Sequence, residues 1–109
     1  MSLPAIEPGD VPTDGSVLLL DCREDDEWQA GHVDGALHIP MAQLPTRIDE
    51  VDTSRTVVCI CRSGNRSGKV TAWLLNNSHT AVNMTGGMKA WAAAGRAVRG
   101  TGTSAGTVI

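Results

Sequence analysis

Two short apolar runs constrain the fold more than any other feature of the sequence. Residues Val17–Asp21 are apolar at every position until the final acid, and Thr56–Ile60 is a short, β-branched and apolar segment. A strand without polar interruptions is typical of a parallel sheet that is buried on both faces. Helical patterns follow both runs, and strands that alternate with helices predict an α/β fold. We therefore expect a small, mostly parallel central sheet flanked by helices on both faces.

Turn residues and periodicity divide the rest of the chain into short elements. Gly31 and Gly95 are placed to end helices, and Pro45 restricts where a helix can begin. The predicted strands cover residues 5–6, 17–21, 36–39, 56–60 and 81–84, and the predicted helices cover residues 24–30, 42–50, 66–77 and 88–94.

The length and composition fit a single domain in a reducing compartment. The chain has 109 residues, so we expect one domain at 1–99 and a flexible, Gly-, Thr- and Ser-rich tail at 100–109. Phe and Tyr are absent, which makes the three tryptophans, Trp28, Trp73 and Trp91, the expected packing anchors. The net charge of −3 argues against nucleic-acid or anionic-membrane partners.

Cysteine count and hydropathy bear on the cellular location. Three cysteines, an odd number, do not suggest a disulfide framework, and a cytoplasmic location is the simplest expectation. No apolar run approaches the roughly 20 residues that span a bilayer. The N-terminus lacks the basic and apolar regions of a signal peptide.

The candidate site follows the strand at 56–60. Ligands of parallel α/β sheets bind beyond the carboxyl ends of the strands, and the segment there is Cys61-Arg62-Ser63-Gly64-Asn65-Arg66-Ser67. A loop that curls onto a helix start would direct main-chain N–H groups at the sulfur of Cys61. Gly64 permits the turn, and Arg62 and Arg66 add positive charge. This environment favours the thiolate, which is the nucleophilic form of cysteine.

Four separated motifs carry a resemblance to a known family. They are residues 20–23 (LDCR) with 27–28 (EW), residues 31–40 (GHVDGALHIP), residues 61–66 (CRSGNR) and residues 85–91 (TGGMKAW). In this order, over roughly residues 16–96, they resemble the rhodanese (sulfurtransferase) domain. The resemblance implies a rhodanese-like fold and the transfer of a sulfane sulfur through a persulfide on a catalytic cysteine. It implies no metal and no organic cofactor.

Carried over by position, the resemblance makes Cys61 the catalytic sulfur carrier. The main-chain amides of the loop would bind the anionic persulfide, and the residues concerned are Arg62, Ser63, Gly64, Asn65 and Arg66. The two arginines would also attract a small anionic donor such as thiosulfate. A protein persulfide is the other expected donor, and a thiol or a protein cysteine is the expected acceptor.

Other residues near these motifs have a mainly structural interpretation. Asp21 and Arg23 resemble the family's acid-x-Arg motif and are expected to support the loop as a charge pair. Cys59 is expected to be buried and inert, and Cys22 would lie near the site if its strand neighbours that of Cys61. The histidines lack ligand-like spacing with cysteine, so no zinc site is expected.

Two alternative functions remain open from the sequence. One is a non-catalytic sensor or docking module on the same fold, which the intact Cys61 and charged loop disfavour. The other is a phosphatase or arsenate reductase, whose related loops place the arginine one position later than Arg66 lies after Cys61. The shorter loop resembles the sulfur-transferring branch.

Overall fold

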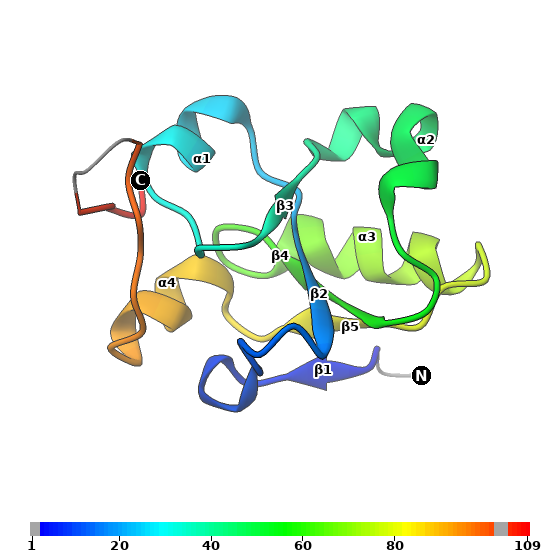
Figure 1. Ribbon diagram of the computed structural model, residues 1–109, viewed down its shortest axis with the longest axis horizontal. Helices are drawn as coiled ribbons and strands as arrows, with labels where there is room; N and C mark the ends of the chain where they lie inside the picture. The colour runs from blue at the N-terminus through cyan, green and yellow to red at the C-terminus, as the bar shows by residue number, and fades with distance from the viewer. Residues whose placement is uncertain (1–2, 102–104) are drawn as a thin grey trace.

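A parallel sheet forms the centre of the protein. The computed structural model describes residues 3–101 and 105–109, and within them five strands pair in the order β1-β5-β4-β2-β3, with every pairing parallel (Figure 1). The strands are β1 (Ala5–Ile6), β2 (Val17–Asp21), β3 (Leu37–His38), β4 (Thr56–Ile60) and β5 (Ala81–Met84). The predicted parallel sheet is confirmed, although β3 is shorter than the predicted strand.

Alternate residues of the two central strands enter different cores. Leu18, Leu20, Val57 and Cys59 belong to a core cluster that also contains Leu44, Val70 and Leu74. Leu19, Val58 and Ile60 belong to a second cluster, which contains Met88 and Trp91. Successive strand side chains point to opposite faces. Both faces of the sheet are therefore buried, as the uninterrupted apolar runs predicted.

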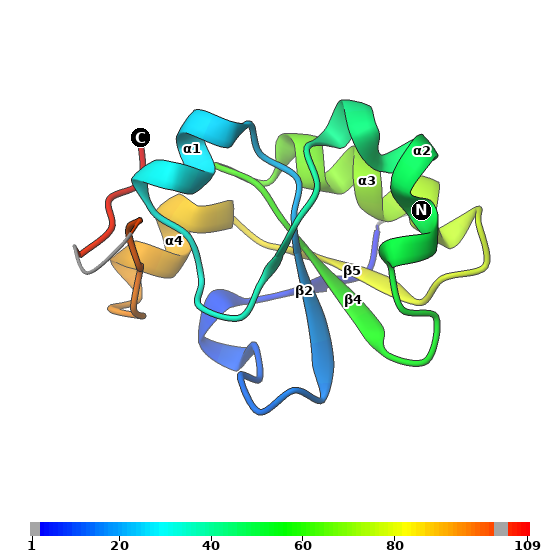
Figure 2. The same cartoon turned by 45° about the horizontal axis from the view of Figure 1, so that its top comes forward.

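Helices cover both faces of the sheet (Figure 2). The helices α2 (Leu44–Arg47) and α3 (Asn65–Leu75) supply Leu44, Val70 and Leu74 to the first cluster, whereas α4 (Gly87–Ala93) supplies Met88 and Trp91 to the second. The helix α1 (Asp25–Ala30) begins with a capping box in which Glu24 and Glu27 satisfy each other's main-chain amides. The predicted arrangement of helices on both faces is confirmed.

The segment predicted as helical at 42–50 is helical but divided into short turns, and its α-helix begins beside Pro45, as predicted. The segment consists of a 3₁₀ turn at Met41–Gln43, the single turn of α2 and a second 3₁₀ turn at Ile48–Glu50. Pro45 stands in the first turn of α2. It has no N–H with which to continue a hydrogen-bond ladder from the preceding turn, so it restarts the helix there.

The structure describes part of the tail and all three tryptophans. Residues 102–104 of the predicted mobile tail lie outside the described residues, while Thr107 donates its amide to the Ala30 carbonyl at 2.8 Å. The predicted mobility of 100–109 stays a prediction. Trp91 is buried in the core, but Trp28 and Trp73 are half-buried. Among residues 3–101 and 105–109, no helix is long and apolar enough to cross a membrane.

Candidate active site

Cys61 lies at the carboxyl end of β4, in the loop that leads to α3. The loop turns at Gly64, whose φ of 102° lies in the left-handed region that favours glycine. This turn brings the Gly64 amide back to the cysteine, and it donates a hydrogen bond to Sγ at 3.0 Å. Cys61 is itself 1 % exposed, whereas the neighbouring Arg62 and Ser63 are exposed. The sulfur-bearing residue is thus buried directly beneath the exposed residues of its own loop.

Hydrogen bonds to the sulfur outweigh the effect of its burial. Burial raises the pKa of Cys61, but the Ser67 hydroxyl and the amides of Ser67, Gly64 and Ser63 lower it, and the pKa ends below its ordinary value. The Ser67 hydroxyl lies 3.2 Å from Sγ. Burial instead raises the pKa of Cys59 to about 11. Of these two thiols, Cys61 is the one whose surroundings favour the nucleophilic thiolate.

Main-chain amides at the start of α4 donate hydrogen bonds to two carbonyls of the same loop. The Met88 amide donates to the Cys61 carbonyl at 2.8 Å, and the Lys89 amide donates to the Arg62 carbonyl at 3.0 Å. These amides belong to the first turn of α4, where helical N–H groups have no partner within the helix. The loop carbonyls are thus bound on one side while loop amides face the sulfur on the other. The motif at residues 85–91 did not predict this role for α4.

The Arg66 guanidinium is bound by a carboxylate from α1. Its two terminal nitrogens lie 2.7 and 2.8 Å from the two oxygens of Glu27. Hydrogen bonds from Arg66 lower the pKa of Glu27 to about 2, and the same bonds raise the pKa of Arg66. A bidentate pair of this kind fixes the guanidinium in place. Glu27 therefore balances the charge that was predicted to attract an anionic donor.

The Glu27–Arg66 pair predicts a pH-dependent contribution to stability. We expect Glu27→Gln to lower the free energy of unfolding at pH 7 by about 1–2 kcal/mol, because it removes a charge-assisted hydrogen-bond pair. The folded-state pKa of about 2 lies below the ordinary value of 4.5, so this stability is present above pH 4.5. It is lost as the pH falls towards 2. Urea unfolding of both proteins at several pH values measures the difference, and a constant difference across this range would contradict the assignment.

Two other predicted loop residues, Arg62 and Asn65, are exposed to solvent. Arg62 is exposed, and its Nε donates to the main-chain oxygen of Ile109 at 2.8 Å. Asn65 is exposed and is the first residue of α3. The structure thus brings Ser63, Gly64 and Ser67 to the sulfur, and it directs the two arginine side chains towards Ile109 and Glu27.

A buried ion pair lies beside the site, at the end of β2. Arg23 donates to both carboxylate oxygens of Asp21, with the shortest contact at 2.8 Å, and also to the Gly31 carbonyl at 2.7 Å. The two side chains are 0 % and 1 % exposed. Asp21 pairs in register with Ile60, the residue that precedes Cys61. The pair therefore links β2 to the chain around Gly31, next to the strand that carries Cys61.

The register of β2 and β4 also decides the position of Cys22. These strands are neighbours, and the Cys22 amide donates to the Ile60 carbonyl at 3.0 Å. Cys22 is therefore close to Cys61, as predicted for neighbouring strands. Burial raises the pKa of the Cys22 thiol, and the nearby Cys61 raises it further. These surroundings favour the neutral form of the Cys22 thiol, whose Sγ lies 3.3 Å from the Ile60 carbonyl oxygen.

Two polar side chains support the loop in ways that the sequence did not predict, those of Ser67 and Asn83. The Ser67 hydroxyl lies 2.6 Å from Oδ1 of Asn83, and Nδ2 of Asn83 donates to the Gly64 carbonyl at 3.1 Å. Ser67 belongs to the first turn of α3, directly after Arg66. Asn83 lies in β5, where it interrupts an otherwise apolar strand. A polar residue within this short apolar strand was the sequence signal that could have indicated a role for Asn83.

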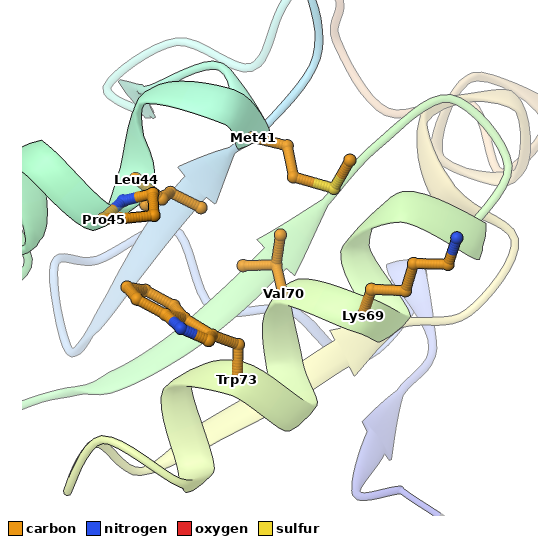
Figure 3. A pocket seen from close by; sticks show the side chains of 6 residues that line it. All are labelled: Met41, Leu44, Pro45, Lys69, Val70 and Trp73. Atoms are coloured by element: carbon orange, nitrogen blue, oxygen red, sulfur yellow. The ribbon is translucent and has the colours of Figure 1, made fainter.

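A separate apolar groove lies between α2 and α3. It has a volume of about 210 Å³ and is lined by Met41, Leu44, Pro45, Lys69, Val70 and Trp73. Figure 3 shows the side chains of Leu44 and Pro45 facing Val70 and Trp73 across it. Cys61 is not among the lining residues. This groove is therefore distinct from the hydrogen-bonded loop.

Comparison with known proteins agrees with the fold and the motifs. The family model of the Rhodanese-like domain matches residues 10–94. A sulfurtransferase of Allochromatium vinosum is 42% identical over 77 residues, covering 70% of this chain and 72% of that protein. The crystal structure of a rhodanese-related protein from Thermoplasma volcanium superimposes with a TM-score of 0.82 at 25% identity, covering 87% of this chain and 96% of the other.

A larger enzyme contains a similar unit. The crystal structure of a thiosulfate sulfurtransferase from Pseudomonas aeruginosa matches with a TM-score of 0.81 at 25% identity, covering 98% of this chain but 22% of that one. The parallel sheet with helices on both faces is the fold of these neighbours. The chain belongs to the rhodanese-like domain family.

Proposed function

We propose that this protein is a sulfurtransferase that carries a sulfane sulfur on Cys61. The observation that carries the proposal is the hydrogen bonding of Sγ by the Gly64 amide at 3.0 Å and the Ser67 hydroxyl at 3.2 Å. These donors stabilise negative charge on the sulfur, which both the attacking thiolate and the departing thiolate require. The sulfurtransferase name of a relative at 42% identity supports the same reaction class.

The reaction consists of two displacements. The Cys61 thiolate attacks the outer sulfur of thiosulfate, the sulfur–sulfur bond of the donor breaks, and sulfite leaves with the electron pair. Cys61 then carries a persulfide anion. A thiol, a protein cysteine or cyanide attacks the outer sulfur, and the Cys61 thiolate leaves with the electron pair. The protein returns to its starting state, so no external oxidant or reductant is needed.

The donor and the location are part of the proposal. Arg62 is an exposed cation of the loop, with its Nε hydrogen-bonded to the Ile109 main-chain oxygen, whereas the charge of Arg66 is paired with Glu27. One exposed cation supports a small anionic donor such as thiosulfate, with a protein persulfide as the other candidate. Cys22, Cys59 and Cys61 are free thiols, which supports a reducing, cytoplasmic location. We place the reacting residues in a domain at 1–99, and the tail at 100–109 meets them where Ile109 accepts a hydrogen bond from Arg62.

Intact mass after incubation with thiosulfate tests the proposal. We expect the parent protein and Cys59→Ser to gain the mass of one sulfur atom, which cyanide then removes as thiocyanate. Cys61→Ser should gain none. A gain of equal size in Cys61→Ser would contradict the assignment of the nucleophile. Failure of the parent to load from both thiosulfate and glutathione persulfide would contradict sulfur transfer, and aryl phosphate hydrolysis in its place would favour a phosphatase.

A further inference from the structure

The Ser67 hydroxyl lies between two atoms that both accept hydrogen bonds. Its oxygen is 3.2 Å from Sγ of Cys61 and 2.6 Å from Oδ1 of Asn83. Ser67 is 0 % exposed, so water does not supply another partner from bulk solvent. A hydroxyl carries a single proton and donates it to one acceptor at a time. The sulfur and the carboxamide therefore compete for the same proton.

The hydrogen bond made by Nδ2 of Asn83 fixes the orientation of its side-chain carboxamide. Nδ2 donates to the Gly64 carbonyl at 3.1 Å, which directs Oδ1 towards Ser67. The Gly64 carbonyl also accepts the Gly68 amide at 3.1 Å. The reverse orientation would place two acceptor oxygens against each other. The Asn83 carboxamide is thus a fixed acceptor for Ser67, and it joins the hydroxyl to the residue whose amide binds the sulfur.

We propose that Ser67 and Asn83 form a hydroxyl switch beneath Cys61. In the thiolate form, the Ser67 proton is donated to Sγ. In the neutral thiol and in the persulfide, it is donated to Oδ1 of Asn83. Ser67 touches the reacting atom and is a catalytic residue, whereas Asn83 acts through Ser67 and is a positioning residue. The persulfide part of this inference rests on the proposed function.

The movement of charge during sulfur transfer explains why the proton would turn. When the persulfide forms, the negative charge moves to the outer sulfur, and Sγ becomes a two-bonded sulfur that is a weak acceptor. The carboxamide oxygen is then the better partner. When an acceptor attacks the outer sulfur, the sulfur–sulfur bond breaks and the electron pair returns to Sγ. The Ser67 hydroxyl turns back and stabilises the leaving thiolate.

Competition for one proton predicts opposite effects of two substitutions. Ser67→Ala removes a donor to the thiolate, and we expect it to raise the pKa of Cys61 by about one unit. Asn83→Leu removes the competing acceptor, and we expect it to lower the same pKa by up to about one unit. A merely structural role for Asn83 would move the pKa upward in both variants, because a loosened loop binds the sulfur less well.

The pH dependence of iodoacetamide alkylation at Cys61, followed by peptide mapping on the full chain, measures these shifts. Support for the switch requires opposite shifts in Ser67→Ala and Asn83→Leu and no further shift when Asn83→Leu is added to Ser67→Ala. Upward shifts in both single variants, or an Asn83 effect that persists without Ser67, would overturn it. Asn83→Ala repeats the test if Asn83→Leu does not fold.

A second measurement follows the persulfide itself. From protein loaded with sulfur, we expect Ser67→Ala to transfer to cyanide about three- to tenfold more slowly, since part of the one-unit change in the pKa of the leaving thiol appears in the rate, and Ser67→Thr to restore the rate. An unchanged rate in Ser67→Ala would overturn the switch in the leaving step. The alkylation experiment needs no sulfur donor, so failure of the switch and failure of sulfur transfer are recorded separately.

Discussion

Gly87→Ala is expected to reduce sulfur loading by about 100-fold and to lower the free energy of unfolding by about 2–4 kcal/mol. A Cβ at this position would lie 2.5 Å from the Cys61 carbonyl oxygen and 2.6 Å from the carbonyl carbon and oxygen of Arg62. These are main-chain atoms of the active-site loop, so the loop itself must move. The φ of 62° adds the cost of a left-handed conformation in a residue with a side chain.

Gly95→Ala is the matched control at the other end of the same helix. Gly95 also has a positive φ, at 79°, but a Cβ there meets nothing within 4 Å. We expect this variant to show the conformational cost of about 1–2 kcal/mol and to keep its rate of sulfur loading. Urea unfolding and the loading rate from intact mass measure both proteins. Equal loading rates in the two variants would contradict a loop position that depends on close contact with α4.

Asp21→Ala is expected to destabilise the protein by about 3–5 kcal/mol, because it leaves the Arg23 guanidinium buried without its counter-ion. Arg23 is 0 % exposed, and it would retain the Gly31 carbonyl as an acceptor. The Arg23 main-chain amide would also lose its bond to the Asp21 carboxylate. Urea unfolding monitored by tryptophan fluorescence measures the loss.

An exposed pair of the same chemistry provides the comparison. Arg47 and Glu50 form an ion pair at 2.7 Å, with side chains that are 33 % and 46 % exposed. Solvent screens such a pair, so Glu50→Ala should cost much less than Asp21→Ala. Replacing both buried partners in D21L/R23M should recover part of the loss, since neither charge is then left alone. Equal losses for Asp21→Ala and Glu50→Ala would contradict this account.

The central strands were predictable because their signals are local. The bounds of β2, β4 and β5 agree with the predicted segments, since apolar and β-branched runs between turns specify short buried strands. The segment at 42–50 was less predictable. Pro45 lies within its helical composition and limits where the α-helix can begin, but no local pattern indicated the 3₁₀ turn at Ile48–Glu50.

The position of Cys61 followed from the sequence, but its supporting contacts did not. A cysteine after a buried parallel strand, before a glycine and a helix start, is placed by topology at the carboxyl edge of the sheet. Glu27 is 39 positions from Arg66, and Asn83 is 16 positions from Ser67. Pairings across such separations depend on strand order and register, which no local pattern specifies.

The hydrogen bonds from α4 to the loop carbonyls fix the direction of the main-chain dipoles around Cys61. With the Cys61 and Arg62 carbonyls bound by Met88 and Lys89, the dipoles of the loop are oriented before any donor arrives. In water, solvent molecules must rotate to accommodate a new anion, whereas a fixed main-chain array has completed that reorganisation during folding. In the reaction that we propose, charge can then pass between Sγ of Cys61 and the outer sulfur of the persulfide without movement of the backbone.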